Sequence, residues 1–154
     1  MAAREPIEVT VEINGREVVC GTLRIHERGG ETATFRYADA YLASPDSYDL
    51  DPVLPRSAGV FQSPGGKPVF SSFADSAPDR WGENLMRREE RERAKIAGTT
   101  PRALLAADFL LGVRDDARQG AIRFRDPGGG SYYSAHRHAF ETDQRHIART
   151  LAND

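Results

Sequence analysis

Apolar and polar residues alternate along the first part of the chain with a period of two, which is typical of strands buried on one face. Ile7–Ile13 and Thr32–Tyr37 follow this pattern, and the apolar stretch Val18–Ile25 lies between them. Asn14-Gly15 joins the first two stretches and favours a tight hairpin turn, because both residues tolerate positive φ. Gly21 interrupts the second stretch, which indicates a β-bulge or a close approach of another backbone segment. We therefore predict a three-stranded antiparallel meander.

Proline and glycine dominate the next part of the chain. Asp39–Ala43 predicts one short helical turn, which ends before Ser44-Pro45. Residues 49–67 are rich in Pro and Gly and predict a loop with short strands near residues 50–54 and 60–61.

Apolar residues then recur with the spacing of α-helices. A long helix is predicted to begin near Asp79, after Pro78, and to end at Gly98, a residue that suits a C-terminal cap. Trp81, Leu85 and Met86 are predicted to form its buried stripe. A second helix is predicted to start with Thr100 as its N-cap and Pro101 at its first position, and to close at Gly112.

Residues 120–125 predict a last strand, which ends at Asp126-Pro127. The predicted fold class is α+β: a small curled antiparallel sheet, made of the N-terminal meander and this late strand, packed with two helices. The composition changes after Gly128, where few large aliphatic residues remain. We therefore expect one domain over residues 1–127, followed at residues 128–154 by a Gly-rich linker and a flexible or weakly helical tail.

Composition narrows the function classes. A net charge of -2 over 154 residues does not indicate a nucleic-acid-binding protein. Cys20 is the single cysteine, so no internal disulfide can form, and its apolar surroundings predict a buried structural thiol in a reducing compartment. The sequence has neither a signal peptide nor a stretch of ~20 apolar residues, so we expect a cytoplasmic protein with no membrane contact.

Short motifs give little support for catalysis or cofactor binding. His136, His138 and His146 have no obvious further ligands, and we expect no metal site. The glycine-rich stretches lack the pattern of a phosphate-binding loop, no nucleophile elbow occurs, and we expect no cofactor. The run of arginines and glutamates at residues 87–93 predicts a solvated helix face, because charges of opposite sign alternate in it.

Two groups of residues have more than one interpretation. Trp81 lies at the start of the first long helix, where it is either a core anchor, the usual role of a lone tryptophan, or an exposed interface anchor. Arg114, Asp115, Asp116 and Arg118 form either a plain charged turn or a clamp that holds a neighbouring domain through bidentate ion pairs.

Several of these pieces together resemble the N-terminal part of HipA-family proteins, the serine/threonine kinase toxins of bacterial toxin–antitoxin systems. The most specific are Pro78-Asp79-Arg80-Trp81-Gly82 and, further on, Leu111-Gly112-Val113 with Arg118-Gln119-Gly120-Ala121. The resemblance also includes Ser72–Ala77, Asp108–Leu110 and Ile122–Phe124, and it covers residues 7 to 127.

The resemblance implies a role beside a kinase rather than as one, because the catalytic motifs of the family lie downstream of the matching region and are absent from this sequence. It implies a non-catalytic module that packs on and modulates a HipA-like kinase core on a separate chain, with a helix-turn-helix, HipB-like antitoxin as a further partner. The alternative is a truncated kinase toxin that lacks its catalytic domain. For the module, the expected docking residues are Asp79, Arg80, Trp81, Arg114, Asp115 and Arg118.

Overall fold

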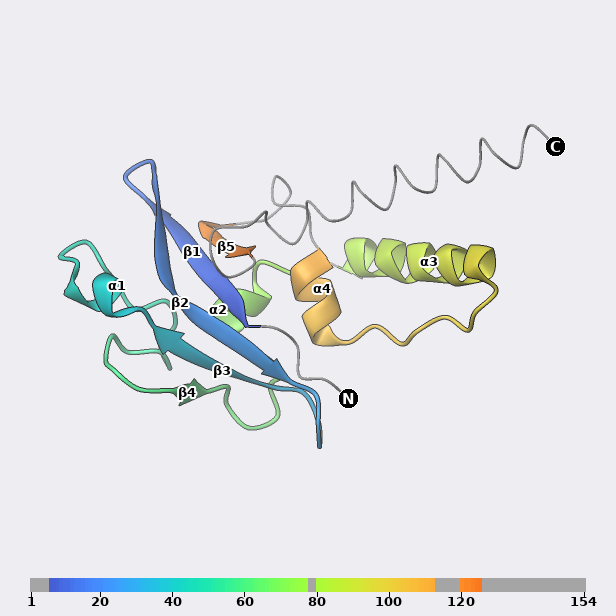
Figure 1. The fold of residues 1–154 in the computed structure, drawn as a ribbon, viewed down its shortest axis with the longest axis horizontal. Helices are drawn as coiled ribbons and strands as arrows, with labels where there is room; N and C mark the ends of the chain where they lie inside the picture. Colours follow the sequence, from blue (N-terminus) through green and yellow to red (C-terminus); the bar gives the residue numbers. More distant parts are fainter. Residues whose placement is uncertain (1–5, 78–79, 113–119, 126–154) are drawn as a thin grey trace.

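A computed structural model describes residues 6–77, 80–112 and 120–125 (Figure 1). Five strands form one antiparallel sheet in the order β4-β3-β2-β1-β5. The predicted meander corresponds to β1 (Ile7–Ile13), β2 (Arg16–His26) and β3 (Thr32–Tyr37). The late strand β5 (Ile122–Arg125) pairs with the other edge of β1, and the two-residue β4 (Phe61–Gln62) pairs with β3. These strands confirm the predicted α+β fold.

Two glycine-containing positions shape the β1–β2 hairpin. Asn14 and Gly15 both have positive φ, 52° and 74°, as the favoured two-residue hairpin turn requires. Further along, Gly21 pairs with Val9 while Val19 pairs with the next residue of β1, so that Cys20 is the extra residue of a β-bulge. Gly21 also meets β3 so closely that a Cβ atom there would lie 2.2 Å from a backbone oxygen. Both expectations for Gly21 are thus confirmed.

The core is built on aromatic rings at the centre of the sheet. Phe35 of β3 contacts Phe70 and Phe73, with ring centroids 6.4 and 5.5 Å apart and edge-to-face geometry. Phe73 lies in the short helix α2 (Ser71–Ala74) and also contacts Phe124 of β5, at 5.8 Å. All four rings are fully buried. The late strand and α2 are therefore joined to the meander by one continuous core.

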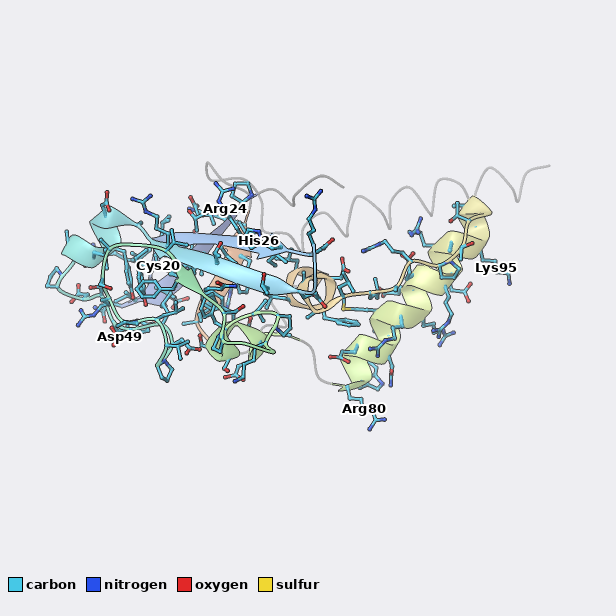
Figure 2. All side chains as sticks on the ribbon, turned by 90° about the horizontal axis from the view of Figure 1, so that it is seen from below. Cys20, Arg24, His26, Asp49, Arg80 and Lys95 are labelled. Carbon is cyan, nitrogen blue, oxygen red and sulfur yellow. The ribbon has the colours of Figure 1, made fainter. Side chains whose placement is uncertain are left out.

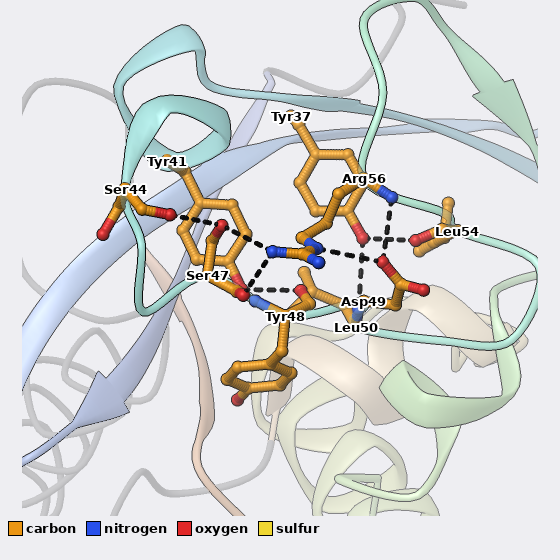
Figure 3. A network of polar contacts seen from close by, with 9 residues as sticks. All are labelled: Tyr37, Tyr41, Ser44, Ser47, Tyr48, Asp49, Leu50, Leu54 and Arg56. Atoms are coloured by element: carbon orange, nitrogen blue, oxygen red, sulfur yellow. Dashed lines mark hydrogen bonds and ion pairs between the residues drawn. The ribbon is translucent and has the colours of Figure 1, made fainter.

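A pair of tyrosines fixes the loop that follows the helix α1 (Asp39–Ala43), a helix that the sequence predicted. The rings of Tyr37 and Tyr41 are stacked, with centroids 5.6 Å apart (Figure 3). The Tyr37 hydroxyl donates to the Leu54 carbonyl at 2.5 Å and accepts from the Leu50 N–H at 3.1 Å. Tyr41 makes the same two kinds of bond with the backbone of Tyr48. Burial raises the pKa of Tyr37 and raises that of Tyr41 to about 12, so both phenols stay neutral hydrogen-bonding groups.

The long helix α3 (Arg80–Ala97) ends where the sequence predicted. Gly98 has φ of 67°, its N–H bonds to the Lys95 carbonyl at 3.3 Å, and the Thr99 N–H bonds to the Ala94 carbonyl at 2.9 Å. These two bonds form a Schellman motif, which uses a residue of positive φ to stop the helix. Figure 1 shows α3 reaching beyond the sheet, with α4 between them.

The second predicted helix begins later than expected: α4 spans Ala106–Gly112, and the prediction of a start at Thr100 is wrong. The free N–H groups at its first turn are satisfied by carboxylates instead of by Thr100. Asp108 accepts from the Leu105 N–H at 2.9 Å, as the third residue of a capping box does. Glu31, from the turn between β2 and β3, accepts from the N–H groups of Ala106 and Ala107 at 3.2 and 3.3 Å.

The domain boundary predicted at residues 127–128, and the tail predicted at residues 128–154, lie outside the described residues.

Candidate docking surface

Trp81 lies in the first turn of α3 with 75% of its surface exposed. The interpretation of this tryptophan as a core anchor is therefore wrong. The predicted buried stripe is also wrong in part, because Leu85 is exposed and only Met86 of the three is buried. Ala94 is the other buried residue of α3. What remains for Trp81 is the second interpretation, an exposed aromatic side chain that is free to contact a partner.

The packed side of α3 rests mainly on α4. Met86 lies against Gly112 so closely that a Cβ atom at Gly112 would be 2.3 Å from its terminal methyl carbon. The guanidinium of Arg87 lies over the ring of Phe109, 4.8 Å from its centroid, in a cation–π contact. Figure 2 shows the consequence: α3 stands apart from the sheet, with Arg80 at one end and Lys95 at the other.

A carboxylate on the same packed side fixes the direction of the chain after α3. Glu90 accepts two hydrogen bonds from Arg93, at 2.9 and 2.7 Å, and one from the backbone N–H of Arg102, at 2.9 Å. Arg102 in turn binds Asp108 of α4 with both terminal nitrogens, each at 3.0 Å. The bonds from Arg93, with that from the Arg102 N–H, hold the pKa of Glu90 at about 2. Glu90 therefore links α3 to the segment that leads into α4.

The outward side of α3 carries a second set of apolar residues. Trp81, Leu85 and Ile96 are 75%, 38% and 58% exposed. Because successive helical residues are about 100° apart, these three positions fall within an arc of about 60°. Met86 and Ala94 lie on the other side of the helix. We call Trp81, Leu85 and Ile96 the outer stripe; it extends for about 22 Å along the helix axis.

A pocket of about 420 Å³ lies beside the first turn of α3. Residues from α2, α3 and α4 line it, and Phe109 and Leu110 supply apolar walls. Ala77 and Glu83, which precede and follow the start of the helix in sequence, both line it, as does Lys67. Because Glu83 is about 160° from Trp81 around the helix, the pocket lies on the packed side of α3 and the outer stripe lies on the opposite side.

Only some of the docking residues predicted from the sequence lie in the described part of the chain. Arg80 is exposed next to Trp81 at the start of α3, and its predicted role in docking stays a prediction. Asp79, Arg114, Asp115 and Arg118 lie outside the described residues. Leu85 and Ile96 were not predicted as exposed residues, although their helical spacing from Trp81 is a signal that the sequence already contains.

The cysteine and the candidate metal ligands of the described residues do not form a reactive site. Cys20 is fully buried and donates its thiol hydrogen to the Val9 carbonyl at 3.1 Å, and burial raises its pKa, which confirms a structural thiol. Within residues 6–77, 80–112 and 120–125, no three His, Cys, Asp or Glu side chains gather in a way that could hold a metal ion. His136, His138 and His146 lie outside these ranges.

Across the same part of the chain, no helix combines the length and the apolar character needed to cross a membrane.

These features define a small α+β domain with an open antiparallel sheet and one long helix that exposes an apolar face. A family model described as the HipA N-terminal domain matches residues 10–108, which is more than half of the chain. The chain therefore belongs to the HipA N-terminal domain family, and this membership suggests a toxin–antitoxin context. The matched range includes all of α3. None of the curated proteins with which the sequence was compared matches it.

Proposed function

We propose that this chain is a non-catalytic module of a HipA-type toxin–antitoxin system. It packs on a HipA-like serine/threonine kinase core supplied by a separate chain and modulates the activity of that core. A helix-turn-helix, HipB-like antitoxin is a further partner in the same assembly. Membership of the HipA N-terminal domain family supports the context, and the exposure of Trp81 is the observation that carries the docking proposal.

The position of Trp81 favours an interface for a physical reason. An indole is large and apolar, and a tryptophan that anchors a core is mostly buried. In interfaces, by contrast, tryptophan and arginine are enriched among the residues that contribute most to binding. Trp81 and Arg80 are both exposed at the start of α3. We propose that Asp79, Arg114, Asp115 and Arg118 belong to the same docking face.

The chain itself does not transfer phosphate in this proposal. Phosphoryl transfer to a protein needs a lysine on the phosphates, a base and magnesium ligands held together. The matched family domain is the N-terminal one, and the family resemblance places the kinase motifs downstream of this domain. The purified chain should therefore show no magnesium-dependent ATP turnover.

The test is co-purification of the chain with the kinase core of a HipA-family protein, together with the autophosphorylation rate of that core. We expect a complex, and a changed rate when the chain is added in equal amount. Trp81→Ala should weaken the complex by about 30-fold, the effect of losing an interface residue worth ~2 kcal/mol. Val60→Ala is the matched control, because Val60 is an exposed apolar residue away from α3.

Two results would contradict the proposal. One is the absence of any complex with the core. The other is a complex that Trp81→Ala and Val60→Ala weaken equally. The reading frames downstream of the gene provide a second check: a separate frame that encodes the core agrees with the proposal, and a core that continues in a shifted frame indicates a truncated toxin.

A further inference from the structure

The outer face of α3 combines the outer stripe with a row of exposed cations. We infer that this face binds an acidic amphipathic helix of a protein partner. The inference deepens the proposed function, and it rests on that function only for the identity of the partner: the acidic helix would belong to the kinase core. The chemistry of this face comes from α3 alone.

The helix separates charges that alternate in the sequence. Read in order, residues 87–93 are Arg-Arg-Glu-Glu-Arg-Glu-Arg, and their charges nearly cancel. At about 100° per residue, however, Arg80, Arg88, Arg91 and Lys95 fall within an arc of about 80°, next to the outer stripe. All four are exposed. We call these four residues the basic ribbon, and it runs the length of α3.

The glutamates of α3 leave the basic ribbon unneutralised. Glu83 pairs with Arg87 at 3.6 Å, and Glu90 pairs with Arg93 at 2.7 Å. These two carboxylates therefore form ion pairs with arginines outside the ribbon. None of the four ribbon cations forms an ion pair with another residue of the described part of the chain. Glu89 lies beyond the far side of the outer stripe, and Glu92 lies within it. A partner that places acidic residues over the ribbon therefore gains ion pairs without breaking any of these.

The dimensions and the apolar stripe favour a helix as the partner. Trp81 and Ile96 are about four helical turns apart. Two packed helices place apolar residues at the centre of the contact and charged residues along its flanks, which is the order in which α3 carries them. A nucleic acid would use the cations, but it would leave Leu85 and Ile96 in water and bring phosphates near Glu92. The partner helix therefore has apolar residues at helical spacing and Asp or Glu along one flank.

Trp81 is the only tryptophan of the chain, so its fluorescence reports directly on this face. The probe is a tryptophan-free amphipathic peptide of about four to five turns with an acidic flank, titrated into the whole chain. We expect the emission of Trp81 to shift to shorter wavelength as the indole leaves water. A peptide with the same apolar residues and a basic flank should give no shift. Binding of the acidic peptide should weaken steeply as salt rises from about 0.01 to about 1 M.

Substitutions on α3 should act in opposite directions. The triple variant R88E/R91E/K95E should bind the acidic peptide at least about tenfold more weakly, because three exposed ion pairs are lost and repulsion replaces them. The variant R16E/R24E/R36E changes the net charge by the same amount at exposed positions of the sheet, and it should bind as the wild type does. E92Q removes the one carboxylate within the outer stripe, and it should bind the acidic peptide more tightly.

The inference is overturned if the acidic and basic peptides bind equally, if the acidic peptide does not bind, or if only duplex DNA shifts the emission. Its failure can be separated from that of the proposed function by using the purified kinase core as a second ligand. If the core binds wild type and R88E/R91E/K95E equally, the proposed function stands and the inference fails. If the acidic peptide binds and the core does not, the chemistry of the face stands and the proposed partner is wrong.

Discussion

Replacing Trp81 by alanine tests whether the largest side chain of α3 belongs to the interior of the domain. Trp81 is 75% exposed, so folding removes only about a quarter of its surface from water. For a side chain of roughly 250 Å² this is about 60 Å². At about 25 cal/mol per Å², Trp81→Ala should lower the free energy of unfolding by at most about 1.5 kcal/mol. A fully buried ring behaves differently: Phe73→Ala should cost about 3–5 kcal/mol.

The assay is urea unfolding followed by circular dichroism, since the variant has no tryptophan left to report by fluorescence. The midpoint should fall slightly for Trp81→Ala, with an unchanged dependence on urea concentration, and fall far more for Phe73→Ala. If the two variants lose the same stability, then Trp81 is part of the core in solution. That result would remove the main residue from the docking surface and refute the assignment of the outer face of α3.

Two further predictions concern the scaffold that positions this surface. Gly21→Ala should lower the free energy of unfolding by about 2–4 kcal/mol, because its Cβ would lie 2.2 Å from a backbone oxygen of β3. Gly65→Ala is the control: nothing lies within 4 Å of that position, so the free energy of unfolding should change by less than about 0.5 kcal/mol. Urea unfolding measures both. Glu90, with its pKa lowered from 4.5 to about 2, stabilises the fold above pH 4.5 and loses this contribution as the pH falls toward 2. Glu90→Gln should therefore be less stable by about 1–2 kcal/mol at neutral pH, allowing for solvent screening, and the difference should shrink toward zero near pH 2; a difference independent of pH would contradict this explanation.

Local sequence patterns predicted the parts of the fold that depend on neighbouring residues. Strand alternation, the positive φ of Asn14-Gly15 and the cap at Gly98 each follow from a few adjacent residues, and the structure confirms them. Gly21 belongs to this group as well, because a glycine within an apolar strand already indicates a bulge or a close contact.

The start of α4 could not be predicted in this way. Thr100 and Pro101 form a locally sound helix start, yet the helix begins at Ala106. The carboxylate that accepts from the N–H group of Ala106 belongs to Glu31, 75 residues earlier in the chain. The Glu31 cap comes from tertiary structure and leaves no signal near the helix. The local cap, Asp108, accepts from the N–H of Leu105, and leucine is a residue type that does not indicate an N-cap.

The orientation of α3 was missed for another reason, since the helix has two apolar arcs and periodicity does not say which one is buried. The arc with the larger apolar side chains, which contains Trp81 and Ile96, faces outward. The smaller arc packs because Met86 fits against Gly112, where α4 has no side chain in the way. The same orientation of the helix brings the ribbon cations to the surface. The alternation of charges along the sequence does not reveal this.

The energetics of this face also limit how small the docking contact can be. About 190 Å² of Trp81 remains exposed, and its complete burial would contribute up to about 5 kcal/mol. Association alone opposes binding by an estimated 4–15 kcal/mol, so Trp81 with Arg80 beside it provides little or no net affinity. A stable complex therefore needs the rest of the outer face, namely Leu85, Ile96 and the basic ribbon along α3. A partner that touches only the start of α3 would therefore dissociate readily, and one that follows the helix to Ile96 would not.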